Sequence, residues 1–228
     1  MNRFAVILTH NRPELLHETW AAIGPQVDMV IVVDNASDPP IRAIDLHGDS
    51  WCTVLMHVPD QPPNLAKFWN LGIRAAMNTY DASPHLAPAH IAMLCDDAIV
   101  PAGWYAAVVE AMTQTAAAVG CSDPFGYMPA GHTRVKTEPD GAIMERMPGH
   151  AWVLDPISPV RPDESMLLWY CDTDMDWQAR KAGGMVMVGG YPVPNVMPSG
   201  FMLTHPELID QTGQDGLTFA AKWSWRPW

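Results

Sequence analysis

Aspartate residues gather at three places in this chain of 228 residues, each after an apolar run. Asp34 ends the first run, Asp96 and Asp97 end the second, and Asp172 and Asp174 follow the third. Carboxylates at the ends of strands can meet in one cleft although they lie far apart in sequence. Adjacent acids after a buried strand suggest a hard cation, because Mg²⁺ or Mn²⁺ takes one or two carboxylates together with ligand phosphates. We therefore expect a site for a divalent cation and a phosphate-bearing ligand.

Each acidic group also has a structural alternative, which the sequence alone leaves open. Asp34 stands among turn-forming residues and can simply form the turn, and Asp96 with Asp97 can begin the loop before the next helix. Asp172 and the acids up to Asp176 can cap a helix and complement the helix dipole in its first turn.

The elements that must position these acids are alternating strands and helices, a pattern typical of parallel strands joined by helices. Predicted strands span residues 4–8, 29–33, 51–58 and 90–94, and predicted helices span 14–23 and 64–80. The polar residues follow these strands, at the edge where open α/β sheets bind ligands. We expect one α/β domain with a mostly parallel central sheet flanked by helices.

The second half of the chain is less regular. Residues 121–149 are rich in Pro and Gly, and we expect a long loop region there, with a short hairpin as its only regular structure. Such segments are often lids or binding loops. Order returns with the apolar segment 166–170, followed by a helix over 174–182 that two glycines close, and by a last central strand over 185–188.

The composition narrows the possible functions. Hydrophobic residues make up 48% of the chain and charged residues 17%, which predicts an ample core. A formal net charge of −12 argues against a nucleic acid or an anionic membrane as the partner. The first apolar run is too short for a secretory signal, and no stretch reaches the roughly 20 apolar residues of a membrane span. The four cysteines form no Cys-x-x-Cys pair, which fits a soluble, cytoplasmic protein.

Five segments, in this order, resemble family 2 of the nucleotide-sugar glycosyltransferases, which have the GT-A fold. They are AVILTHNRPELL at 5–16, VVDNASD at 32–38, NLAKFWNLGI at 64–73, MLCDDA at 93–98 and CDTDMDWQARKAG at 171–183. The resemblance covers most of residues 4–188 and implies one continuous GT-A domain. Residues 1–118 are then the nucleotide-sugar-binding half, and 119–228 the acceptor-side half with the catalytic base and a C-terminal tail.

The resemblance also implies roles for individual residues. Those expected to hold the nucleotide base and ribose are Thr9, Asn11, Arg12 and Asp34. Lys67 is placed to meet a phosphate, although a solvated helix lysine is its structural alternative. Asp97 is assigned to the metal, Mn²⁺ or Mg²⁺, and Asp96 to the ribose or the metal.

The catalytic base is the next implied residue. Asp172 matches the position that supplies the general base in inverting members, and Asp174 is its main competitor. The base takes the proton from an acceptor hydroxyl as that oxygen attacks the anomeric carbon. This chemistry calls for a carboxylate at the end of a strand, facing the sugar.

The chain departs from the family pattern at several positions. Cys171 stands where a Glu is common, and Cys95 stands where an Asp often occurs. The His that usually follows the last central strand as a metal or phosphate ligand is not at the expected place. Asn195 is nearest to that place, and His205 lies further on as a candidate metal ligand, with a satisfied surface or core histidine as its alternative.

The expected function is that of an inverting, metal-dependent glycosyltransferase of the hexosyltransferase type. It would move a sugar from a nucleoside diphosphate-sugar donor to a hydroxyl of a saccharide or protein acceptor. A UDP-type donor is favoured, because a carboxylate can accept the imide N–H of a uracil-type base. A catalytically silent nucleotide-sugar-binding protein and a sugar nucleotidyltransferase are the alternatives. The lack of a Gly-rich, basic phosphate loop near residue 9 argues against the second.

The C-terminal tail carries tryptophans at 223, 225 and 228. Such side chains can stack on a sugar or a lipid-linked acceptor, seal the interface of a homo-oligomer, or pack back on the domain. The sequence does not choose among these roles, nor does it identify the donor sugar or the acceptor.

Overall fold

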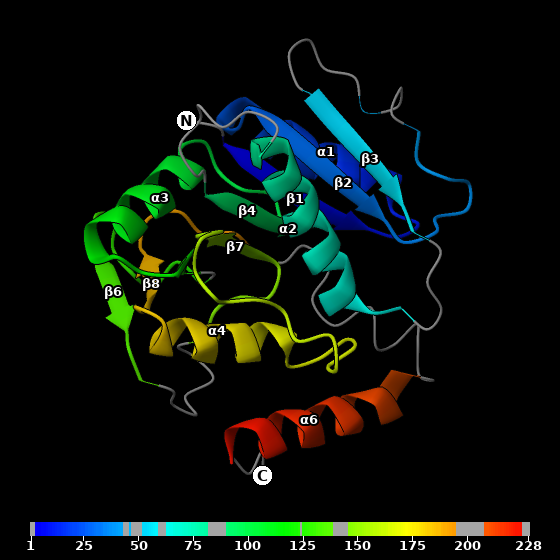
Figure 1. Cartoon of the computed structure of the whole chain (residues 1–228). Helices are drawn as coiled ribbons and strands as arrows, with labels where there is room; N and C mark the ends of the chain where they lie inside the picture. Colours follow the sequence, from blue (N-terminus) through cyan, green and yellow to red (C-terminus); the bar gives the residue numbers. More distant parts are fainter. Residues whose placement is uncertain are drawn as a thin grey trace.

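One mixed sheet runs through the molecule (Figure 1). The computed structural model describes residues 3–42, 46, 52–58, 63–81, 90–123, 125–138, 146–194 and 208–224. Within these residues the sheet has eight strands in the order β3-β2-β1-β4-β7-β5-β8-β6. The strands are β1 Phe4–Thr9, β2 Met29–Asp34, β3 Cys52–His57, β4 Ile91–Cys95, β5 Val119–Ser122, β6 Thr133–Lys136, β7 Ala151–Leu154 and β8 Met185–Val188.

The pairing of the strands brings several carboxyl ends to one edge of the sheet. β1, β2, β3 and β4 pair in parallel, with Thr9 opposite Asp34 and Leu8 opposite Cys95. β7 and β6 pair antiparallel with their neighbours, and β5 pairs parallel with β8. The residues that follow β1, β2 and β4 therefore start from neighbouring positions at the same edge.

Helices cover both faces of the sheet. They are α1 Pro13–Ile23, α2 Leu65–Asp81, α3 Trp104–Thr115, α4 Cys171–Lys181 and α6 Ile209–Trp223. α1 and α3 pack with alternate residues of β1 and β4 in one core, whereas α2 and α4 pack with the other residues of these strands in a second core. This arrangement follows from side chains that alternate between the two faces of a strand. α6 lies outside α4, farther from the sheet (Figure 1).

The single α/β domain and the mostly parallel sheet are confirmed, and the predicted strands and helices of the first half are present within a residue or two of their expected ends. In the second half the expected strand 185–188 is β8, and α4 begins earlier than the predicted helix 174–182. The region 121–149 contributes β6 at the sheet edge, paired with β8 and not with an adjacent strand in a hairpin.

The apolar segment 166–170, where regular structure was expected, does not form a strand. These residues form a turn-rich segment. The carboxylate of Asp215 on α6 accepts hydrogen bonds from the N–H groups of Leu167, Leu168 and Trp169, which in a strand would bond to a neighbouring strand. β5, β7 and α6 were not predicted from the sequence, and the last two residues of β5 lie in the region expected to be a loop. In the part of the chain that the structure describes, no helix is both long and apolar enough to cross a membrane.

Candidate active site

The loops that follow β1 and β2 are bound to each other. Asn35 donates its backbone N–H to the Thr9 carbonyl at 2.9 Å, and Asn11 donates its N–H to the Ser37 hydroxyl at 2.8 Å. Ser37 in turn donates its N–H and its hydroxyl to Asp34, which has no exposed surface. These are the bonds of a turn-forming aspartate, so the structural alternative for Asp34 is present. Its contact with a nucleotide stays a prediction.

Arg12 links the first loop to the acids after β4. Its Nη2 lies 2.8 Å from Oδ1 of Asp96, and its Nη1 lies 3.6 Å from Oδ2 of Asp97. Thr9 donates its hydroxyl to Oδ2 of Asp96 at 2.9 Å. The strand register explains the meeting, because Thr9 and Arg12 leave β1 beside the end of β4. The structure thus brings four of the predicted site residues together.

Burial raises the pKa of Asp96 to about 6, although Arg12 and Thr9 act in the opposite direction. The carboxyl group has no exposed surface, while the guanidinium of Arg12 is 38% exposed. The charge of Arg12 therefore offsets only part of the cost of removing the Asp96 carboxylate from water.

Asp172 lies in the first turn of α4. The sequence analysis placed it at the end of a strand, and this expectation is wrong. Oδ1 accepts the N–H of Thr173 at 2.8 Å. A Cβ atom added to Gly149 would lie 2.5 Å from Oδ2, so only glycine lets the carboxylate approach the backbone this closely. Part of Asp172 is accessible, yet protein atoms crowd it enough that burial raises its pKa, with Arg146 among the groups that oppose the rise.

The segment around Gly149 connects Asp172 to Asp96 and Asp97, the acid pair. Cys95, which directly precedes Asp96, donates its backbone N–H to the His150 carbonyl at 2.9 Å, and its sulfur lies 3.9 Å from the Gly149 carbonyl oxygen. The base candidate and the acid pair therefore border the same edge of the sheet. Sequence analysis missed Gly149, because a lone glycine at the end of a long loop carries no signal of its own.

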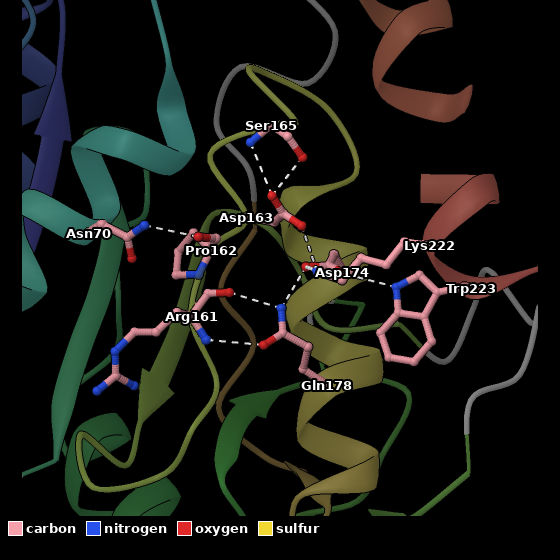
Figure 2. Close-up of polar contacts among 9 residues, drawn as sticks. All are labelled: Asn70, Arg161, Pro162, Asp163, Ser165, Asp174, Gln178, Lys222 and Trp223. Carbon is pink, nitrogen blue, oxygen red and sulfur yellow. Dashed lines mark hydrogen bonds and ion pairs between the residues drawn. The ribbon is translucent and has the colours of Figure 1, made fainter. Parts of the chain in front are cut away.

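Asp174 has its own set of partners, which Figure 2 shows. It is completely buried, and both oxygens accept hydrogen bonds at the contact between α4 and α6. Trp223 donates to Oδ1 at 2.7 Å, and Gln178 and Lys222 donate to Oδ2 at 2.6 and 2.9 Å. Asp174 thus holds two helices together, and the geometry leaves Asp172 as the better candidate for the base.

Three further residues from the sequence analysis are Lys67, His205 and Asn195. Lys67 lies half-buried in the first turn of α2, where its backbone N–H is capped by the side-chain oxygen of Asn64 at 2.9 Å. Its meeting with a phosphate stays a prediction. His205 and Asn195 lie outside the described residues.

The acid pair suits a cation that completes its shell with ligand phosphates. Oδ1 of Asp96 is buried and accepts no hydrogen bond, although Nη2 of Arg12 lies 2.8 Å from it as an ion-pair partner. Over the described ranges, no three His, Cys, Asp or Glu side chains are grouped so that they alone could hold a metal ion. Two carboxylates plus a diphosphate is the arrangement that Mg²⁺ uses in many phosphate sites.

Comparison with known proteins gives likeness in structure only. No family model and no curated protein matches the chain. The crystal structure of S. aureus TarS residues 1–349 matches with a TM-score of 0.66 and 10% identity over 96% of this chain and 70% of that one. Its complex with UDP-GlcNAc matches with a TM-score of 0.64 and 10% identity, over 87% and 60%. A further TarS structure matches with a TM-score of 0.58 and 11% identity, over 97% and 42%.

These values define how far the likeness extends. The chain spans less than two thirds of the length of the TarS chain bound to UDP-GlcNAc, and identities of 10 to 12% show a common fold and not a common activity. TarS is a glycosyltransferase of the GT-A type. The fold of this chain is therefore a GT-A fold, as the five sequence segments predicted.

Proposed function

We propose that this chain is an inverting glycosyltransferase that moves a sugar from a nucleoside diphosphate sugar to a hydroxyl acceptor. The observation that carries the proposal is the placement of Arg12, Asp96, Asp97 and Asp172 along one edge of a GT-A sheet. Open α/β sheets bind their ligands at this edge. A cluster for phosphate and a separate, half-buried carboxylate are the two parts that glycosyl transfer from a diphosphate requires.

Asp172 is the proposed general base. It takes the proton from the acceptor hydroxyl while that oxygen bonds to the anomeric carbon, on the face opposite the diphosphate. The bond from the anomeric carbon to the diphosphate oxygen breaks, the nucleoside diphosphate leaves, and the configuration inverts. The raised pKa of Asp172 strengthens it as a base, because proton transfer is most efficient when the pKa of the base nears the working pH.

Asp97 and Asp96 are the proposed holders of a divalent cation. A bound Mn²⁺ or Mg²⁺ would stabilise the negative charge that develops on the leaving diphosphate. Thr9 and Arg12 orient Asp96 through the contacts described above, and Arg12 keeps a partly exposed guanidinium that can also meet a phosphate oxygen.

The donor is proposed to be a UDP-sugar. TarS, which shares the fold, has been crystallised with UDP and with UDP-GlcNAc. In this chain the linked loops after β1 and β2 form the proposed pocket for the base and ribose, with Asn11 and Asp34 at their junction. The acceptor is proposed to be a hydroxyl of a saccharide or a protein.

A nucleotide-sugar-binding protein without catalysis is the second candidate. The ion pair of Arg12 with both acids favours it, because a protein cation already neutralises the position where a metal would act. Such a protein would bind the donor equally well with and without a divalent ion.

A two-stage experiment separates the candidates. First, thermal unfolding is followed with UDP-, GDP- and dTDP-sugars, each with Mn²⁺ or with EDTA, because a ligand that binds only the folded state raises the melting temperature. A shift with a UDP-sugar that needs Mn²⁺ is expected, and no shift with any donor would contradict both candidates. Second, release of UDP from the binding donor is measured by mass spectrometry. Binding without any release of UDP, to water or to an acceptor library, supports the second candidate over the first.

A further inference from the structure

α6 packs on the beginning of α4 and on the segment before it (Figure 1). The ring of Phe219 on α6 lies 4.9 Å from that of Trp177 on α4 and 5.4 Å from that of Tyr170. Cys171, the residue before the proposed base, belongs to the same apolar cluster and is 3% exposed. α6 therefore covers the chain immediately beside Asp172.

Asp215 forms the polar centre of this contact. It is completely buried, and its carboxylate accepts the N–H groups of three consecutive residues, Leu167 at 3.0 Å and Leu168 and Trp169 at 2.9 Å each. Gln211 on the preceding turn of α6 donates to Oδ1 at 2.7 Å. A buried carboxylate that accepts several N–H groups fixes their positions strongly, because hydrogen bonds to a charged group are stronger than neutral ones.

A second contact fastens the other end of the segment. Lys222 of α6 bridges Asp163 at 2.7 Å and Asp174 at 2.9 Å, as Figure 2 shows. Gln178 of α4 and Arg161 exchange two hydrogen bonds between the Gln178 side chain and the Arg161 backbone. The segment 161–170 is thus held at both ends by α4 and α6.

The same segment also touches the start of α2. Leu65 donates its N–H to the Leu167 carbonyl at 2.6 Å, and Asn64 donates its side-chain amide to the Glu164 carbonyl at 2.9 Å. Asn70 reaches the Pro162 carbonyl at 2.9 Å (Figure 2). The segment therefore spans the distance between α2, which carries Lys67, and α4, which carries Asp172.

The backbone at the end of the segment is strained. Tyr170 has φ 63°, in the left-handed region that a bulky residue rarely adopts. Its carbonyl accepts the N–H of Asp174 at 2.7 Å, so this conformation starts α4 and sets the direction in which Asp172 leaves the helix. Conformations of this kind persist only where the surrounding structure imposes them. Here the surroundings are Phe219 and the three N–H groups that Asp215 holds.

We infer that Asp215 is a positioning residue for Asp172: by fixing the segment 167–169 it holds Tyr170 in its strained conformation and aims the carboxylate of Asp172 at the edge of the sheet. This inference rests on the proposed function of Asp172 as the base. Asp215 touches neither donor nor acceptor in this scheme, and its side chain bonds to the segment 167–169 and to Gln211, not to the loops after β1, β2 and β4.

The test compares Asp215→Asn with Asp210→Asn, an exposed acid in the first turn of the same helix. Reactivity of Cys171 toward iodoacetamide is followed by mass spectrometry, with Cys121 as the internal reference. Both thiols are buried, and burial raises the pKa of each. In Asp215→Asn we expect Cys171 to react at least about tenfold faster while Cys121 is unchanged, since only the cover over Cys171 is loosened. Asp210→Asn should react as the wild type does.

Turnover gives the second readout. For Asp215→Asn, kcat should fall about 10- to 100-fold while the KM for the donor changes less than about threefold, because a displacement of about 1 Å at the base slows the chemistry without removing donor contacts. Calorimetric donor binding at unchanged stoichiometry shows that the loss is not a smaller folded fraction. Unchanged kcat overturns the inference, and so does equal acceleration of Cys171 and Cys121, which indicates general destabilisation.

The proposed function and the inference about Asp215 fail on different results. If the wild type transfers no sugar, the proposed function fails, whereas the Cys171 comparison still decides whether Asp215 holds the segment. If Asp215→Asn does not fold, Gln211→Leu removes only the amide that donates to Asp215, and the same acceleration at Cys171 is expected with smaller amplitude. A Cys171 that stays as protected as in the wild type overturns the inference in either protein.

Discussion

The proposed donor side of the site lies at the ends of β1, β2 and β4, and the proposed base side lies at the start of α4. The two sides are built in different ways. On the donor side, strand register places Thr9 beside Asp34 and near the acid pair, and short loops complete the contacts. On the base side, Asp172 depends on Gly149 and on a segment that a separate helix holds through Asp215. Backbone pairing fixes the donor side, so single side-chain changes should disturb its geometry little. The geometry of the base side depends on a few side chains. Mutations on the two sides should therefore affect different steps.

The largest effect is expected for Asp172→Asn. Transfer should fall about 10³-fold, because removal of a general base costs on the order of 10² to 10⁴ in rate. Donor affinity should stay within about threefold, since the donor side lies at other strands. The measurements are steady-state turnover and calorimetric donor binding, with Asp210→Asn as the control. Full activity in Asp172→Asn would remove this residue as the base.

Gly149→Ala tests the base side without touching a charge. The new Cβ would lie 2.5 Å from Oδ2 of Asp172, which is too close, so the carboxylate must move. A shift of about 1 Å should lower kcat about 100-fold with little change in donor affinity. Gly213→Ala is the matched control, because open space surrounds that position and turnover should not change. A Gly149→Ala protein as active as the control would show that the position of Asp172 does not limit the reaction.

Asp97→Asn tests the donor side. Loss of one of two carboxylates should weaken donor binding about tenfold in Mn²⁺, because the proposed cation would lose a ligand and would hold the diphosphate less tightly. The same variant in EDTA should bind the donor as the wild type does in EDTA. Isothermal calorimetry in both buffers checks this. Equal losses in the two buffers would mean that Asp97 acts without a metal.

The contribution of Asp96 to the free energy of unfolding should fall as the pH rises. Its pKa is about 6 in the folded protein against 3.8 as the ordinary value, because burial disfavours the charged form. The group's stabilising contribution is therefore complete below about pH 4 and is lost as the pH rises to 6 and above. The difference between a pKa of about 6 and the ordinary 3.8 corresponds to about 3 kcal/mol as an order of magnitude. Urea unfolding of the wild type and of Asp96→Asn, from pH 4 to 7, gives the free energy of unfolding of each protein. The difference between the two should fall as the pH rises. A constant difference would contradict the raised pKa.

The two sides also differ in how much of them can be predicted from sequence. The donor side is local in pattern: apolar runs end at polar residues, and parallel pairing then brings these ends together. Strands 4–8, 29–33 and 90–94 were predictable for this reason, and with them the meeting of Thr9, Arg12, Asp96 and Asp97. The pairing of Arg12 with both acids was not, because no residue spacing specifies an ion pair between two loops.

The structure of the base side depends on contacts between residues that are far apart in sequence. The apolar segment 166–170 resembles a strand, but its N–H groups bond to Asp215, which lies more than forty residues further along the chain. β7 is a four-residue, completely buried strand next to a Pro- and Gly-rich stretch, and its pairing with β4 and β5 joins it to residues far away in sequence. The choice between Asp172 and Asp174 likewise depends on α6, whose Lys222 and Trp223 occupy Asp174. No pattern within 171–183 contains that information.

The smallest predicted effect concerns Lys222, which joins α6 to Asp163 and to the buried Asp174. Lys222→Met should lower the free energy of unfolding by about 1 kcal/mol, because a partly exposed ion pair contributes little and Trp223 and Gln178 still donate to Asp174. Lys181→Met, which removes only a cation 4.6 Å from the ring centre of Trp223, is the control and should cost less than about half as much. Turnover should fall less than for Gly149→Ala, since Asp215 still holds the residues next to Asp172. If Lys222→Met lowers kcat as strongly as Gly149→Ala, then the base side is controlled from the Asp163 end of the segment and not from Asp215.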